Sequence, residues 1–198
     1  MRLLEVGERL FATTGIDATP TRQICREAGV HQDAIHYHFG TKDRFVAAIL
    51  DAGIDRVDHH LARRLAEAEV EGSRRPASVA TLAQAVVTAT TDMSDEPGLG
   101  RHYLGFLTAL LANPRLRPLA TGRPTSWGQR MVDSLTPLTP ELTESERVYR
   151  VAITGFLIIH MIGMDSESLG QWLAVSGTPY DQDPHRLLVQ TLVSVLSG

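Results

Sequence analysis

The apolar residues of this chain recur at intervals of three and four along most of its length. Such spacing places them on one face of an α-helix, whereas a half-buried strand alternates apolar and polar residues. Nowhere do Val and Ile alternate with polar residues over the length of a strand. The pattern therefore predicts an all-α protein of about nine helices, without internal repeats.

Four helices are expected at the start of the chain, and small residues mark their ends. They are predicted near residues 3–14, 20–28, 32–38 and 41–71. Gly15, Gly29 and Gly40 follow the first three helices, and glycine readily adopts the backbone conformation that ends a helix. Thr41 is the expected N-cap of the fourth helix.

The remainder of the chain is expected to form a longer helical body. Its helices are predicted near residues 77–92, 98–112, 115–135, 141–164 and 184–197. Thr139 followed by Pro140 is a start signal for the helix near 141–164, because proline fits the first helical position. Residues 166–183, rich in Gly, Ser and Pro, are expected to connect the last two helices.

The composition is that of an ordinary globular protein, with 43% hydrophobic and 21% charged residues. No run of about 18 uncharged apolar residues is present, which argues against a membrane span. Cys25 is the only cysteine, so an internal disulfide is excluded and a cytoplasmic location is expected. The net charge of −4 argues against a polybasic surface. It does not exclude nucleic acid as a partner, because the local placement of charge matters more than its sum.

The stretch I-C-R-E-A-G-V-H-Q-D-A-I-H-Y-H-F has the layout of a helix-turn-helix unit. Gly29 permits the positive φ of the tight turn, and Val30 is expected to fill the angle between the two helices. Ile24 and Ile35 are expected to pack together inside the pair. The second helix then exposes side chains able to meet base edges or phosphates in a major groove, namely Gln32, Asp33, His36 and Tyr37.

Here the sequence resembles the TetR family of bacterial transcriptional regulators. The resemblance covers residues 1 to about 50, through the stretches L-F-A-T-T-G-I-D-A-T, I-C-R-E-A-G-V and A-I-H-Y-H-F-G-T-K-D. It implies a three-helix DNA-binding domain over residues 1–48. It also implies a helical ligand-binding and dimerisation domain over residues 49–198, where the match is one of helical architecture only.

The resemblance implies which residues meet DNA. Thr21 and Arg22 match positions that touch a phosphate and a base edge, and Lys42 matches a phosphate-binding lysine. A separate physical argument supports Lys42, because the first amides of the helix that it opens already favour an anion. The complete set of expected DNA contacts is Thr21, Arg22, Gln32, Asp33, Ala34, His36, Tyr37, His38 and Lys42.

Two of these residues depart from the family pattern. His36 stands where the family commonly has tyrosine, and Asp33 places an acid opposite a polyanion. That aspartate is costly unless it accepts a hydrogen bond from cytosine N4, or pairs with Arg22 or another neighbour. A basic arm before the first helix is missing as well, so such an arm is absent or the natural chain begins upstream.

The resemblance implies a ligand cavity among the middle helices and a homodimer formed by the last two long helices. A dimer is needed because two recognition helices must lie about one DNA turn apart. The helices near 141–164 and 184–197 are the expected dimer contact, where Gly155 and Gly163 permit close approach. Stripes of aromatic and methionine side chains are more often part of a core, but under the resemblance these are the residues able to line the cavity: His102, Tyr103, Phe106, Trp127, Met131, His160, Met161 and Met164.

These inferences predict a one-component transcriptional regulator, favoured as a repressor. A homodimer would bind a palindromic operator in double-stranded DNA, and a small-molecule effector would shift the population towards a state that releases DNA. The fourth helix is the expected coupling element. No cofactor is expected.

Two alternatives stay open. The first is a helical enzyme or metal-binding protein that uses His31, His36 and His38. Helical spacing disfavours it, since the first two are five residues apart and the last two face nearly opposite sides. No acid–base pair or nucleophile motif supports an enzyme either. The second alternative is a helical adaptor that no longer binds DNA, which the neutral first fifty residues and Asp33 favour.

Overall fold

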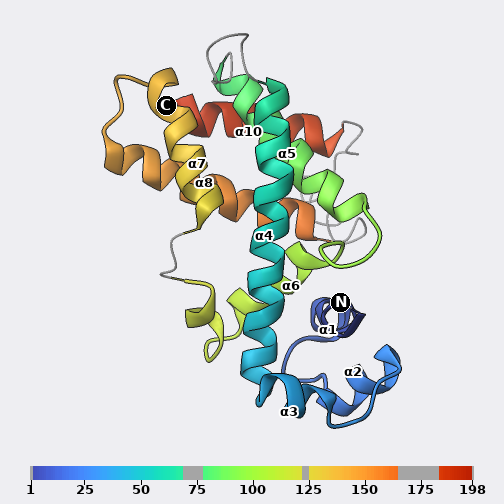
Figure 1. The fold of residues 1–198 in the computed structure, drawn as a ribbon. Helices are drawn as coiled ribbons and strands as arrows, with labels where there is room; N and C mark the ends of the chain where they lie inside the picture. Colours follow the sequence, from blue (N-terminus) through green and yellow to red (C-terminus); the bar gives the residue numbers. More distant parts are fainter. Residues whose placement is uncertain (1, 69–77, 122–124, 165–182, 198) are drawn as a thin grey trace, which may run out of the picture. The chain divides into compact units, whose positions relative to one another are not determined.

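A computed structural model of the chain describes residues 2–68, 78–121, 125–164 and 183–197. Within these ranges it contains nine α-helices, two short 3-10 helices and no strand (Figure 1). The all-α fold predicted from the hydrophobic pattern is confirmed. The helices are α1 (Arg2–Thr14), α2 (Thr21–Ala28), α3 (Ala34–Phe39), α4 (Lys42–Ala68), α5 (Val79–Asp95), α6 (Tyr103–Ala112), η1 (Arg117–Leu119), α7 (Ser126–Leu135), η2 (Thr136–Leu138), α8 (Glu144–Gly163) and α10 (Pro184–Ser197).

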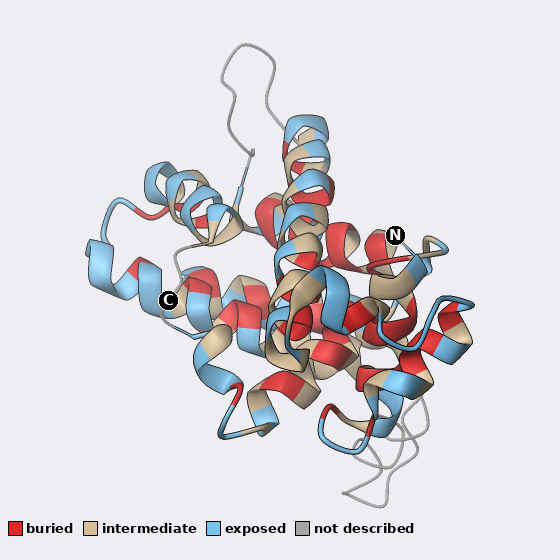
Figure 2. Ribbon diagram, turned by 60° about the horizontal axis from the view of Figure 1, so that its bottom comes forward, coloured by how far each residue is buried: buried red, intermediate tan, exposed pale blue. Residues whose placement is uncertain are grey.

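Most helices carry a buried stripe opposite an exposed one, as the spacing of apolar residues predicts (Figure 2). None of the helices in the described ranges combines the length and hydropathy that a membrane span requires.

Contacts between residues divide the chain into two compact units. Unit 1 comprises Met1–Arg56 and Met93–Arg123, and unit 2 comprises Val57–Asp92 and Pro124–Gly198. Helices α4 and α5 each contribute residues to both units. The domain boundary expected at residue 48 lies inside α4, and that division stays a prediction.

The helix-turn-helix part of unit 1 follows the sequence prediction closely. Ile24 and Ile35 are 0% and 1% exposed, and Gly29 has a φ of 71° after the last residue of α2. Cys25 is buried as well. The expectation for Val30 is wrong, because its side chain is 42% exposed.

Unit 1 also contains α6, and the turn that precedes it is hydrogen-bonded to α1. The buried carboxylate of Glu8 accepts the backbone N–H of Gly100 at 2.9 and 3.0 Å and that of His102 at 2.8 Å. Gly100 has a φ of 103°, and a Cβ there would lie 2.7 Å from Nε of Arg56. Glycine is therefore required at this turn for both conformation and space.

The segment after α6 is bound to the start of unit 1 as well. The Asn113 amide donates to Asp17 at 2.8 Å. Arg115 forms ion pairs with Asp43 at 2.6 Å and with Asp17 at 3.4 Å. Both ends of α6 are thus held to the elements that carry the helix-turn-helix.

The burial of Glu8 makes a prediction about pH. Burial raises the pKa of this carboxyl above its ordinary value of 4.5, although the bonds from His102 and Gly100 and the charge of Arg56 act in the opposite direction. An acid with a raised pKa holds its proton longer in the folded state than in the unfolded state. Folding stability is therefore highest below pH 4.5 as far as Glu8 is concerned, and it falls as pH rises through the raised pKa.

Replacing Glu8 by Gln should remove this dependence, because an amide oxygen can still accept both backbone N–H groups without ionising. We expect the unfolding free energy of wild type, relative to Glu8→Gln, to decline between acidic and neutral pH. Urea unfolding of both proteins across this range measures the difference. If the unfolding free energies of the two proteins changed in parallel with pH, the raised pKa of Glu8 would be contradicted.

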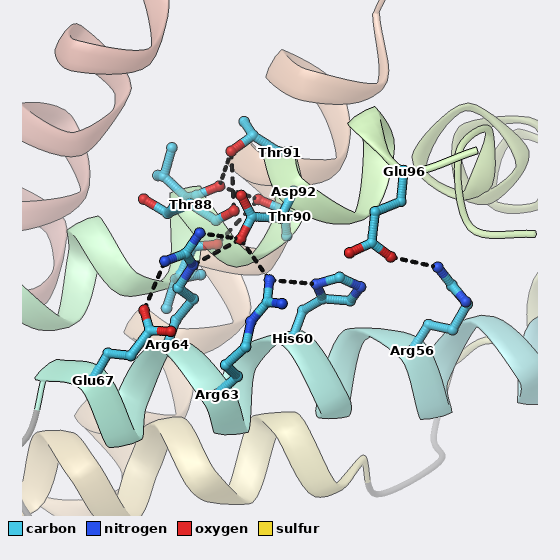
Figure 3. A network of polar contacts seen from close by, with 12 residues as sticks. Arg56, His60, Arg63, Arg64, Glu67, Thr88, Thr90, Thr91, Asp92 and Glu96 are labelled. Atoms are coloured by element: carbon cyan, nitrogen blue, oxygen red, sulfur yellow. Dashed lines mark hydrogen bonds and ion pairs between the residues drawn. The ribbon is translucent and has the colours of Figure 1, made fainter. Parts of the chain in front are cut away.

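Unit 2 is a helical bundle with one apolar core. The core includes Leu82, Met131, Leu135 and Leu192, each 0% exposed. At its surface, α4 and α5 are joined by ion pairs (Figure 3): Asp92 accepts from Arg63 at 2.9 Å and from Nε of Arg64 at 2.7 Å. Nη2 of Arg63 also lies 3.3 Å from Nδ1 of His60.

Several helix boundaries differ from the prediction for physical reasons. Helix α8 begins at Glu144, because Thr143 and Glu146 form a reciprocal capping box. The start expected at Thr139 and Pro140 is wrong, since Thr139 is buried and accepts two hydrogen bonds from Arg147, at 3.2 and 2.7 Å. The other differences are a start of α3 at 34 and a start of α6 at 103 after two glycines of positive φ. The helix predicted near 115–135, with an interruption around residues 122–124, is found as a 3-10 helix and α7, and residues 122–124 themselves lie outside the described ranges. The connection predicted over residues 166–183 lies almost entirely outside the described residues.

Candidate nucleic-acid interface

Residues of α2, α3 and the start of α4 enclose an open pocket of about 500 Å³ in unit 1, here called the head pocket. It is lined by Pro20, Thr21, Arg22, Gln32, Asp33, Ile35, His36, Gly40, Thr41 and Lys42. Six of these ten are among the nine predicted DNA contacts: Thr21, Arg22, Gln32, Asp33, His36 and Lys42. Side chains that are distant along the sequence are therefore brought to one concave surface.

The head pocket lies at the first turns of two helices. Helix α2 begins at Thr21, directly after Pro20. Helix α4 begins at Lys42, and Thr41 accepts the N–H of Arg44 at 3.2 Å, which confirms Thr41 as its N-cap. The unpaired amides of a first helical turn favour an anion. The pocket therefore combines two helix starts with the cations of Arg22 and Lys42.

Lys42 is partly buried at the edge of the core. Its Nζ lies 5.7 Å from the centroid of the Phe11 ring, a distance at which a cation and an aromatic face attract. Burial lowers the pKa of this amine, and the nearby charge of Arg115 lowers it further, whereas Asp17 and Asp43 raise it. Packing against Phe11 therefore fixes the position of the Lys42 amine at the edge of the head pocket.

Three acids near this surface are paired with arginines. Glu27 accepts from Arg9 at 2.6 Å, which lowers the pKa of Glu27, and Arg115 pairs with both Asp17 and Asp43. By contrast, Arg22 and Arg44 are exposed. A Cβ at Gly40 would lie 3.7 Å from Nη1 of Arg44, which places that guanidinium beside the pocket rim. A neutral sum of charges is thus compatible with a locally cationic surface.

The sequence prediction of DNA contacts did not include Thr41 and Arg44. The sequence identifies Thr41 only as a helix cap, and its position next to Lys42 was the available signal. For Arg44 the signal was weaker, because only the structure shows the guanidinium beside Gly40.

Asp33 lies at the N-cap position of α3, beside His31. Its Oδ2 lies 3.7 Å from Nδ1 of His31, and its backbone N–H donates to the same nitrogen at 3.4 Å. Both side chains are exposed, at 70% and 77%. The neighbour that accompanies Asp33 is therefore His31, and among the described contacts no bond to Arg22 is found.

His36, Tyr37 and His38 are all exposed along α3. Nδ1 of His36 lies 2.8 Å from the carbonyl oxygen of Gly40, the residue that ends the helix. Tyr37 is 84% exposed, and its ring meets the His38 ring edge-on at 5.0 Å. Ala34, the ninth predicted contact, is half-buried at the start of the helix.

The residues predicted to line an effector cavity are distributed over both units. Tyr103 and Phe106 are buried in unit 1 with ring centroids 6.0 Å apart, and His102 precedes them. In unit 2, Met131 is fully buried, and Trp127 packs against Gly155, whose Cβ would lie 2.7 Å from the indole. His160 and Met161 lie in the last turn of α8, and Met164 follows it. A common ligand-binding role for this set stays a prediction.

A second pocket, of about 480 Å³, lies in unit 2. It is lined by Ser145, Glu146, Tyr149, Arg150, Ile153 and Val195, none of which was predicted to bind a ligand. Within the described ranges, no three His, Cys, Asp or Glu side chains are arranged to hold a metal ion.

The class of protein that this fold and surface define is an all-helical chain with a helix-turn-helix at its N-terminus. The sequence model of "Bacterial regulatory proteins, tetR family" matches residues 3–49. Over 62 residues the chain is 37% identical to the HTH-type transcriptional regulator TtgR of Pseudomonas putida, a match that spans 31% of this chain and 29% of that regulator's length. Residues 3–49 of the chain therefore match the N-terminal segment of the tetR family of bacterial regulatory proteins, in the region where the sequence motifs indicated a resemblance.

Solved structures with a similar fold cover nearly all of the chain. They include the multidrug binding protein EbrR in complex with imidazole (19% identity, TM-score 0.56, 98% of this chain and 92% of that chain). Others are AmtR of Mycobacterium smegmatis (20%, 0.56, 99% and 84%) and a transcriptional regulator from Aquifex aeolicus VF5 (15%, 0.59, 98% and 95%). At these identities the likeness concerns the fold alone.

Proposed function

We propose that this chain is a ligand-responsive transcriptional regulator that binds palindromic operator DNA as a homodimer in the cytoplasm. In this proposal it acts as a repressor and is released from DNA by a small-molecule effector. It performs no chemical reaction on its ligands.

One observation carries the proposal: six side chains that the family motifs assign to DNA line a single pocket between two helix starts and α3. Thr21, Gln32 and Arg22 can donate to phosphates or base edges, and Lys42 adds a cation at the start of α4. The pairing of nearby acids with Arg9 and Arg115 supports the same surface, because it reduces repulsion of a polyanion.

The dimer contact is proposed on α8 and α10. One face of α8 packs into the core of unit 2, whereas Val148, Tyr149 and Phe156 are 51%, 68% and 55% exposed. Large apolar side chains gathered on one exposed helix face are typical of an interaction surface. Gly155 has a different role from the one predicted, since Trp127 of the same chain occupies the space beside it.

The effector is proposed to be a small organic molecule bound in the C-terminal body. The similar folds include EbrR, which is named for the binding of several drugs. Helix α4 is the proposed coupling element, because it contributes to both units. The attachments at the two ends of α6 within unit 1 supplement this proposal, since one joins the turn before α6 to α1 and the other joins the segment after α6 to Asp43 of α4, next to the pocket residue Lys42.

A gel-shift titration with the DNA upstream of the protein's own gene tests the proposal. We expect a discrete complex that survives competition by random-sequence duplex and contains two chains per operator, as measured by sedimentation. Its affinity should fall steeply with salt, because phosphate contacts release counterions. A failure to bind any duplex selectively, with the helical fold intact by circular dichroism, would favour the adaptor alternative.

A further inference from the structure

The imidazole of His36 has a defined hydrogen-bonding state in this fold. Its Nδ1 lies 2.8 Å from the carbonyl oxygen of Gly40. A carbonyl oxygen can only accept, so the hydrogen of this bond must be on Nδ1. Because a neutral imidazole carries one N–H, Nε2 is left with a lone pair and without a hydrogen.

The end of α3 determines this state. Gly40 follows the helix with a φ of 76°, and its own N–H donates to the carbonyl of His36 at 2.9 Å. The two residues are therefore joined by one backbone bond and one side-chain bond. A ring held in this way would lose little further rotamer freedom if its other nitrogen bound a ligand.

His36 is exposed and lines the head pocket together with Arg22 and Gln32. These neighbours offer different chemistry: an arginine only donates, whereas a glutamine amide both donates and accepts. In the major groove, the donors are the exocyclic amino groups of adenine N6 and cytosine N4. A neutral ring with a bare Nε2 can accept from these groups but cannot donate to guanine O6 or N7.

We infer that His36 is a specificity-determining residue that accepts a hydrogen bond from an exocyclic amino group of one base pair in each half-site. This inference rests on the proposed function and adds the class of base atom that position 36 recognises. It also explains how His36 would differ from the tyrosine that is common at this position in the family. A tyrosine hydroxyl can donate as well as accept a hydrogen bond, whereas Nε2 of His36 would only accept.

The test begins with duplexes selected from random-sequence DNA by wild-type protein and by His36→Ala. The base pair at which His36→Ala loses preference is the candidate contact. Two analogues are then placed there: one lacks the exocyclic amino group, and the other is a 7-deazapurine that lacks the N7 acceptor. We expect loss of the amino group to weaken wild-type binding by about tenfold and His36→Ala binding by less than about twofold.

The 7-deazapurine should leave wild-type binding unchanged at this position. His36→Gln serves as the conservative variant, because its amide oxygen can accept, and it should keep the sensitivity to the amino group. The inference is overturned if N7 removal weakens binding through His36, or if His36→Ala keeps every base preference of wild type. Either result would leave the proposed DNA-binding function intact, because the wild-type protein would still bind selected duplexes. A wild-type protein that enriches no duplex would instead overturn the proposed function itself.

Discussion

Replacing Arg22 and Lys42 together by Ala should lower the affinity of the chain for its selected duplex by at least about a hundredfold. Both side chains line the head pocket, from α2 and α4 respectively. A dimer carries each residue twice, so every lost contact counts once per half-site. Loss of the base-directed arginine should also relax sequence preference, whereas loss of the lysine should weaken binding to all sequences alike.

Salt dependence separates these two contributions. Lys42→Ala alone should reduce the slope of log K against log salt by about 2, one phosphate in each half-site. Fluorescence anisotropy with a labelled duplex measures both affinity and slope. Arg130→Ala is the matched control, because it also removes one exposed positive charge but lies on α7 in unit 2. An equal loss of affinity in the control would show that total charge, and not the head pocket, governs binding.

The N-terminal helices could be predicted because their signals are local. Gly29 ends α2 in the left-handed conformation, Thr41 caps α4, and Ile24 and Ile35 are buried on the two short helices. Each of these features depends on residues a few positions apart. The motifs around them were therefore sufficient to predict one surface for the DNA contacts.

Other features depend on residues distant in the sequence, and periodicity does not reveal them. Glu8 has the position of an ordinary polar residue in α1, yet it is fully buried against the turn before α6. The sequence contains two helix-start signals close together before α8, one at Pro140 and one at Thr143. The helix begins after Thr143, where the reciprocal capping box forms. The aromatic residues near 103–106 fit both a core and a cavity by pattern, since both environments select apolar side chains.

Exchange of Gly53 for Val is the substitution expected to destabilise unit 1 most. Gly53 is buried on α4, and a Cβ at this position would overlap the ring of Tyr103. That ring cannot easily move, because its hydroxyl donates to the carbonyl of Leu50 at 3.1 Å and its other contacts include Phe106 at 6.0 Å. Overpacking of a closed core costs about 3 kcal/mol, and a branched side chain against a fixed ring lies at or above this value.

Urea unfolding measures the loss, with Gly53→Ala as a milder variant that stays folded if valine does not. Alanine gains about 1 kcal/mol over glycine in helix propensity, so its net cost should be near 2 kcal/mol. The double variant Gly53→Ala with Tyr103→Leu should cost less than the sum of the two single changes, because leucine leaves room for the added methyl group. Strict additivity, or a Gly53→Ala protein as stable as wild type, would contradict the close approach of α4 to the Tyr103 ring.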